Sequence, residues 1–151
     1  MNIDAYEQSI ELFNIFRPED ININCGVSDR NEKMEYYMFH DSGARNTFLV
    51  DQNDTKEAVE VKMIDMRNIN DILEEYHVDK IDFMDIDIEG LEEKVIQTFN
   101  WKKYHPKCVL IELLGKSIED VLKTAIHKKM REEGYILASF YTITALYINY
   151  N

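Results

Sequence analysis

The apolar run KCVLIEL, Lys107–Leu113, constrains the fold of this chain most strongly. It is short, continuous and rich in branched residues, which is typical of a strand buried on both faces of a parallel sheet. A second apolar run, Lys80–Ile86, precedes it, and a helical pattern from Leu91 to about Phe99 separates the two. Strand, helix and strand predict a parallel α/β unit in which Lys80–Ile86 is a central strand.

The rest of the chain carries comparable signals. Residues 4–20 predict an amphipathic helix with Asp4 as its N-cap and Pro18 as its stop. Further strands are predicted at 21–28, 33–39 and 59–66, helices at 68–78 and 117–134, and a terminal hairpin at 135–151. Because no linker is visible, we expect one α/β domain over residues 1–151, with a mostly parallel sheet and an antiparallel C-terminal hairpin.

Charge and composition exclude several classes of function. The chain of 151 residues has 17 Lys and Arg against 29 Asp and Glu, a net charge of -12. Such a field repels phosphate backbones and anionic membrane surfaces, so we expect neither nucleic acid nor membrane as a partner. No apolar run reaches the roughly 20 residues that span a bilayer. Cys25 and Cys108 lack metal-ligand spacing, which favours buried thiols in a cytoplasmic protein.

Three carboxylates, Asp85, Asp87 and Glu89, alternate just before Gly90. On a strand they share one face, and ligands of open α/β sheets bind beyond the carboxyl ends of the strands. Capping of the next helix by Asp87 and Glu89 explains them equally well. Asp85 and Asp87 also match the Asp-x-Asp metal site of a glycosyltransferase or phosphoryl-transfer enzyme, but the sequence has no phosphate cradle, and we expect no metal.

These residues carry a resemblance to a known family. The segment IDFMDIDIEGLEEKVI, Ile81–Ile96, followed by HPKCVLIEL, resembles the central motif and next strand of FkbM-type methyltransferases. Residues 17–39 are similar to that family's third strand, its Ser-Asp turn and its hairpin, and SGARNTF, Ser42–Phe48, is similar to its following loop. The resemblance covers the chain from about Ile3 to the final hairpin.

The resemblance implies a Rossmann-like sheet and S-adenosylmethionine-dependent methylation, mostly of hydroxyl groups on small molecules or sugars. It implies that Asp87 and Glu89 lie at the sulfonium and the acceptor as catalytic residues, with Asp87 also touching the cofactor. Asp4 corresponds to the acidic residue that holds the cofactor ribose. The turn that lies at the adenine in this family corresponds to Gly26, Val27, Ser28 and Asp29.

The sequence departs from the family in one respect. The family begins with a strand and a glycine-rich cofactor loop, whereas the five glycines here are widely separated and no Gly-x-Gly cluster precedes the first helix. We therefore expect an N-terminally truncated sheet with a gap beside the strand of Phe83, and weak or absent S-adenosylmethionine binding. Either the parts flanking the gap close up with altered packing, or a second copy covers the exposed edge and forms a homodimer. Whether the chain is an active enzyme or a non-catalytic methyltransferase-like domain stays open.

Overall fold

The computed structural model of the protein describes residues 3–40, 45–49, 54–114 and 116–150, with the backbone alone for residues 3–8 and 54. The elements in chain order are α1 (Ile3–Phe16), β1 (Gly26–Ser28), β2 (Glu32–Met38), η1 (Asp54–Lys56), β3 (Glu60–Asn68), α2 (Ile69–Glu75), β4 (Phe83–Ile86), α3 (Glu92–Thr98), α4 (Trp101–Tyr104), β5 (Cys108–Glu112), α5 (Ile118–Val121), α6 (Ala125–Glu132), β6 (Ile136–Tyr141) and β7 (Thr144–Ile148). The predicted α/β class is confirmed.

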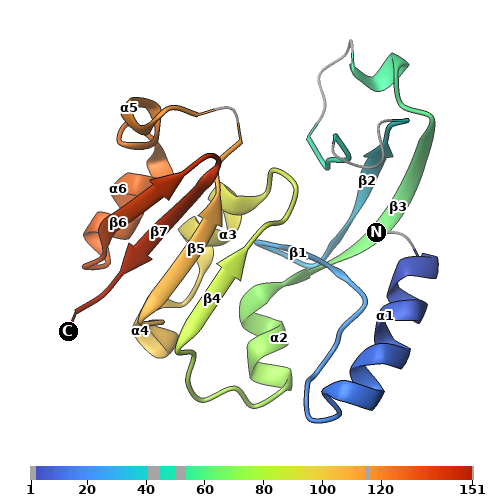
Figure 1. Ribbon diagram of the computed structural model, residues 1–151, viewed down its shortest axis with the longest axis horizontal. Coiled ribbons are helices and arrows are strands. Elements are labelled where there is room, and N and C mark those ends of the chain that lie inside the picture. The colour runs from blue at the N-terminus through green and yellow to red at the C-terminus, as the bar shows by residue number, and fades with distance from the viewer. Residues whose placement is uncertain (1–2, 41–44, 50–53, 115, 151) are drawn as a thin grey trace.

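The strands form two sheets and not one (Figure 1). One sheet has the order β1-β3-β2 and the other the order β4-β5-β7-β6. The parallel pairings are β1 with β3 and β4 with β5, whereas β2–β3, β5–β7 and β6–β7 are antiparallel. The prediction of a single, mostly parallel sheet is therefore wrong, because β1 pairs along β3 and does not reach β4.

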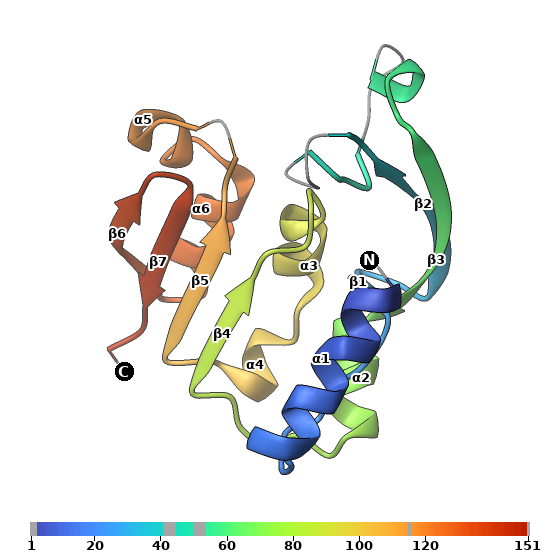
Figure 2. The same ribbon diagram turned by 45° about the vertical axis from the view of Figure 1, so that its right-hand side comes forward.

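Strand β4 lies at the edge of its sheet, so the prediction of a central strand is also wrong. Within the described part of the chain it pairs only with β5, in the register Phe83↔Cys108 to Ile86↔Ile111. The Phe83 side chain is 55% exposed. The expected gap beside Phe83 thus appears as an open strand edge between the two sheets (Figure 2). Pairing of this edge with a second copy stays a prediction.

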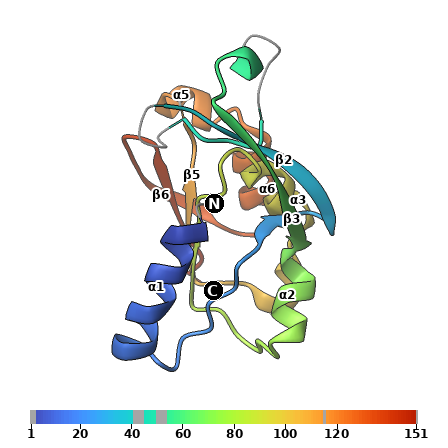
Figure 3. The ribbon, with the colours of Figure 1, turned by 90° about the vertical axis from the view of Figure 1, so that its right-hand side faces the viewer.

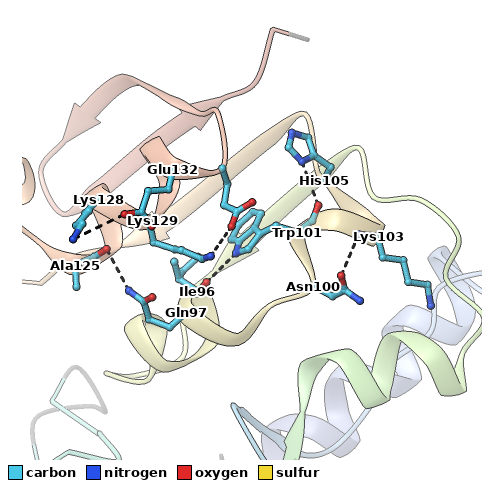
Figure 4. A network of polar contacts seen from close by, with 11 residues as sticks. Ile96, Gln97, Asn100, Trp101, Lys103, His105, Ala125, Lys128, Lys129 and Glu132 are labelled. Carbon is cyan, nitrogen blue, oxygen red and sulfur yellow. Dashed lines mark hydrogen bonds and ion pairs between the residues drawn. The ribbon is translucent and has the colours of Figure 1, made fainter.

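The hydrophobic core belongs to the β4-β5-β7-β6 sheet and the helices packed on it. Val109 and Ile111 on β5 are fully buried, as are Tyr135 and Tyr147 beside them. Figure 4 shows the helix side of this core, where the Trp101 indole Nε1–H donates to the Ile96 carbonyl over 2.9 Å. The opposite face of β5, with Cys108, Leu110 and Glu112, is only half-buried, so the prediction of a strand buried on both faces is confirmed for one face.

The helix expected over residues 117–134 is divided into α5 and α6. The predicted capping box between Ser117 and Asp120 is confirmed at the start of α5. Thr124 then adopts an extended conformation, and its hydroxyl accepts a hydrogen bond from the His127 N–H, which makes it the N-cap of a second helix. A side chain that caps a helix thus interrupts a continuous helical pattern. Gly134 follows α6 with a φ of 87°, as expected of a terminating glycine.

Helix α1 forms in the predicted segment, although it begins before the predicted N-cap Asp4, and it leaves apolar side chains in solvent. Leu12, Ile15 and Phe16 are all exposed. Figure 3 shows α1 and α2 on either side of the coil that leads into β1. No helix in the described ranges combines the length and the apolar character needed to cross a membrane. Cys25 and Cys108 are free and half-buried, so the prediction that both are buried is confirmed only in part.

Candidate functional site

The candidate site lies where β4 and β5 end. The two strands are parallel neighbours with Ile86 opposite Ile111, so Asp87 and Glu112, the next residue in each strand's direction, lie at the same edge of the sheet. After Asp87 the chain turns sharply, because Glu89 has a φ of 57° and Gly90 a φ of 104°. Gly90 adopts this conformation readily, whereas Glu89 does so at a cost.

Three carboxylates gather at this edge. An oxygen from each of Asp87, Glu92 and Glu112 lies within 4.8 Å of the others. Burial, the Asp87 charge and a hydrogen bond with Asp87 raise the pKa of Glu112 from 4.5 to about 7. Two carboxyl groups can share a hydrogen bond only when one of them holds a proton. Asp87 and Glu112 therefore form an acid pair that keeps a proton close to neutral pH.

Glu92 shapes the turn. Its side chain is buried, with 7% exposed, and its Oε1 accepts hydrogen bonds from the Ile88 N–H at 3.0 Å and from the Gly90 N–H at 3.1 Å. The N-cap of α3 is Leu91, which makes no side-chain capping bond. The alternative in which Asp87 and Glu89 cap this helix is therefore wrong, and Glu92 satisfies the backbone groups of the turn instead.

A cavity of about 170 Å³ connects the two sheets at the carboxylates. Gly26 and Val27 of β1 and Tyr36 of β2 line one side, and Asp87 and Glu89 line the other. Burial and the charges of Asp87 and Glu92 raise the pKa of Glu89. Burial and the Glu89 charge likewise raise the pKa of Tyr36. The structure thus brings two residues of the predicted adenine turn to both predicted catalytic carboxylates.

Two further hollows flank the turn. One of about 250 Å³ is lined by Glu92, Glu112 and Lys116 together with Gly90. The other, of about 290 Å³, is lined by Arg45, Asn46, Thr47, Glu89, Gly90 and Leu114. Since Gly90 and Leu114 line both, the hollows meet over the turn and offer space for a second molecule beside the acid pair.

The remaining predicted cofactor residues lie outside the 170 Å³ cavity. Ser28 is fully buried, and its hydroxyl donates to Asp29 Oδ1 over 3.0 Å. Burial acts to raise the pKa of Asp29, but the Ser28 hydrogen bond and the Arg30 charge lower it overall. Asp4 lies in the first turn of α1 and not at its N-cap, and its side chain is outside the described part of the structure.

Gly26 has a packing role. A Cβ atom there would lie 2.2 Å from Sδ of Met66, its partner on β3. Met66 is buried, with 2% exposed, so its side chain has little room to move. A glycine at this position therefore reflects close contact between β1 and β3, whatever the cavity binds.

Sequence reasoning missed two members of the carboxylate cluster. Glu112 is a lone charged residue in the otherwise apolar run Cys108–Leu113, and an acid at the end of a buried strand was a usable signal. Glu92 gave a weaker signal, because an acidic residue in the first turn of a helix is common. Asp85 is exposed and does not belong to the cluster, which disfavours the Asp-x-Asp metal alternative.

The fold and the site define an α/β domain with acidic side chains at the ends of parallel strands. The family model described as the methyltransferase FkbM domain matches residues 4–137. The chain therefore belongs to the FkbM methyltransferase family, as its sequence predicted. Comparison with curated proteins found no match, and comparison with solved structures found none either.

Proposed function

We propose that this domain catalyses S-adenosylmethionine-dependent methylation of a hydroxyl group on a small molecule or sugar. The observation that carries the proposal is the acid pair of Asp87 and Glu112 beside Glu89, because Asp87 and Glu89 also line a cavity together with Gly26 and Val27 of β1. Methylation of a hydroxyl needs a group that accepts its proton, and a general base works best when its pKa lies near the working pH.

The cavity suits one part of the cofactor. Apolar and aromatic walls, including Val27, Tyr36 and Phe48, fit a flat base, while Asp87 and Glu89 offer negative charge. When bound, S-adenosylmethionine supplies an electrophilic methyl group on a positively charged sulfur, which nearby carboxylates favour electrostatically. The cavity of about 170 Å³ is smaller than the roughly 300–1,000 Å³ of ligand pockets. We therefore propose weak binding through the adenosine end.

Each of the three carboxylates has a different role in the proposed reaction. An acceptor hydroxyl in the hollow beside Glu112 lies next to the acid pair, whose deprotonated form accepts the hydroxyl proton on a carboxylate oxygen of Glu112. Asp87, hydrogen-bonded to Glu112, stabilises the proton once it has been taken up. Glu89 lines the cavity with β1, and its carboxylate attracts positive charge there.

The proposal is tested with Glu112→Gln and Asp87→Asn, using Asp85→Asn as a matched control. Asp85 is an exposed carboxylate on the same strand and lies outside the cluster. Release of S-adenosylhomocysteine is measured with a panel of sugars and hydroxylated small molecules, together with calorimetric binding of S-adenosylhomocysteine. Loss of a general base lowers turnover about 10²–10⁴-fold. We expect that loss in the first two variants and wild-type turnover in the control.

The pH dependence separates the base from a residue that only supports the fold. Wild-type turnover should rise as Glu112 loses its proton near its pKa of about 7, and Glu112→Gln should abolish that rise. Turnover in Glu112→Gln with the wild-type pH profile contradicts the assigned role. A wild-type chain that neither binds S-adenosylhomocysteine nor turns over any acceptor in the panel supports the non-catalytic alternative.

A further inference from the structure

The segment Arg45–Leu49 connects the β1-β3-β2 sheet to the turn after β4. Thr47 is tied to β2, because Tyr37 N–H donates to the Thr47 carbonyl over 3.0 Å and Thr47 N–H to the Tyr37 carbonyl over 3.1 Å. From this position the Thr47 hydroxyl donates to the Glu89 carbonyl over 2.8 Å, and the Phe48 N–H donates to the same carbonyl over 3.3 Å. Two donors from the segment bound to β2 thus share the Glu89 carbonyl, which follows β4 of the second sheet.

The Glu89 backbone is one that needs support from its surroundings. Its φ of 57° lies in the left-handed region, which is strained for every residue other than glycine. Such a conformation persists only when the surroundings hold it. Thr47 and Phe48 supply hydrogen bonds to Glu89 itself, and the Leu49 side chain packs against Gly90, the next residue of the turn.

Holding the Glu89 backbone also sets the direction of its side chain. Once the carbonyl and φ are fixed, the Cα–Cβ bond of Glu89 can point in one direction only. From that direction the half-buried Glu89 side chain lines the 170 Å³ cavity together with Asp87. The aromatic ring of Phe48 lies 4.7 Å, between centroids, from the ring of Tyr36 and closes another wall of the same cavity.

We propose that Thr47 is a positioning residue, whose hydroxyl holds the Glu89 carboxylate at the cavity and so makes its placement depend on contact between the two sheets. The importance of this placement for methyl transfer rests on the proposed function, whereas the placement itself does not. The charged and titratable groups around Glu89 are Asp87 on its own turn, Glu92 on α3, Glu112 on β5, Tyr36 on β2, and Arg45 of the connecting segment.

The test compares Thr47→Val, which keeps the shape and removes the hydroxyl, with Thr47→Ser, which keeps the hydroxyl. The titration of Glu89 is followed by NMR on protein labelled with carboxyl-¹³C glutamate, and Glu89→Gln identifies its signal. In Thr47→Val the Glu89 side chain should move away from the cavity wall, and its pKa should fall towards that of an ordinary glutamate. In Thr47→Ser the pKa of Glu89 should match wild type. Thr98→Val is a further control, because the Thr98 hydroxyl donates to the Lys94 carbonyl within α3.

A purely structural role gives a different result. Thr47→Val that melts at a lower temperature but shows wild-type Glu89 titration overturns the positioning role. Should Thr47→Val fail to fold, hydrogen exchange of the Phe48 amide in the wild-type protein decides, because the proposal requires protection and rapid exchange overturns it.

Activity separates this proposal from the proposed function. If wild type transfers methyl groups, Thr47→Val should be about tenfold slower, as expected for loss of one supporting hydrogen bond, and Thr47→Ser should restore the rate. Unchanged turnover in Thr47→Val with a shifted Glu89 titration supports the placement of Glu89 by Thr47 and overturns its importance for methyl transfer. The expected Glu89 titration in a chain without methyl transfer supports the positioning role and overturns the proposed function.

Discussion

Replacement of Glu112 by Gln should change how the free energy of unfolding depends on pH. The pKa of Glu112 is 4.5 ordinarily and about 7 in the folded protein, so the folded state holds the proton more tightly than the unfolded state. Its contribution to stability is therefore fully present below pH 4.5 and is lost as the pH rises through about 7. Wild type should unfold more easily at pH 8 than in mild acid.

The magnitude follows from the two pKa values. Between about pH 8 and about pH 5.5, the pKa values of 4.5 and about 7 correspond to about 2 kcal/mol of stability. Because Glu112 is only half-buried, solvent screening reduces this to about 1 kcal/mol. Gln carries no charge and can still donate a hydrogen bond to Asp87, so Glu112→Gln should be about 1 kcal/mol more stable than wild type near pH 8.

Urea denaturation followed by circular dichroism at both pH values measures this difference. Asp85→Asn serves as the control, since it removes an exposed charge from the same sheet. Glu112→Gln removes one carboxyl group, so the comparison isolates Glu112 and the carboxylates that interact with it, Asp87, Glu89 and Glu92. Equal pH dependence in wild type and Glu112→Gln would refute the acid pair.

Three further substitutions test the packing around the site, each by urea denaturation. Gly26→Ala should cost about 1–3 kcal/mol, because its Cβ would overlap the buried Met66 side chain, and Met66→Ala in the same chain should reduce this penalty. Trp101→Phe should cost about 1–3 kcal/mol by leaving the Ile96 carbonyl without its buried donor. Asn70→Ala should cost about 1–2 kcal/mol, because it loses hydrogen bonds to the Thr98 carbonyl at 3.1 Å and to the Asn100 N–H at 2.8 Å. A variant as stable as wild type would contradict the contact assigned to it.

Local features of the fold could be predicted from the sequence. Helix α1, the capping box at Ser117 and the terminal hairpin depend on contacts between residues near one another in the chain, and the alternating patterns of β2 and β3 identify each of these strands by itself. The division into two sheets could not be predicted, because the choice of partner for β1 depends on a distant strand. The 3-residue β1 has few hydrogen bonds to offer, so its hydrophobic pattern does not specify which edge it joins.

The candidate site was predictable in part for the same reason. The spacing of Asp87 and Glu89 before Gly90 identified them as candidates, and they lie at a strand end as expected. Glu112 joins them only because β5 lies parallel to β4 in a particular register. The contact of Thr47 with Glu89 spans 42 positions of sequence and crosses between the sheets, and no local pattern encodes it.

The distribution of buried side chains has a consequence for how the protein folds and opens. All fully packed members of the main core lie between Ile86 and Tyr147, in a continuous stretch of chain. Contacts within such a stretch close short loops, so this part should form early and resist local opening. The β1-β3-β2 sheet should open at lower free energy, which hydrogen exchange would show as weaker protection of β2 and β3 than of β5 and β7. The contacts of the Glu89 turn with Thr47 and Phe48 would then form last, when the β1-β3-β2 sheet packs against the part of the chain that folded first.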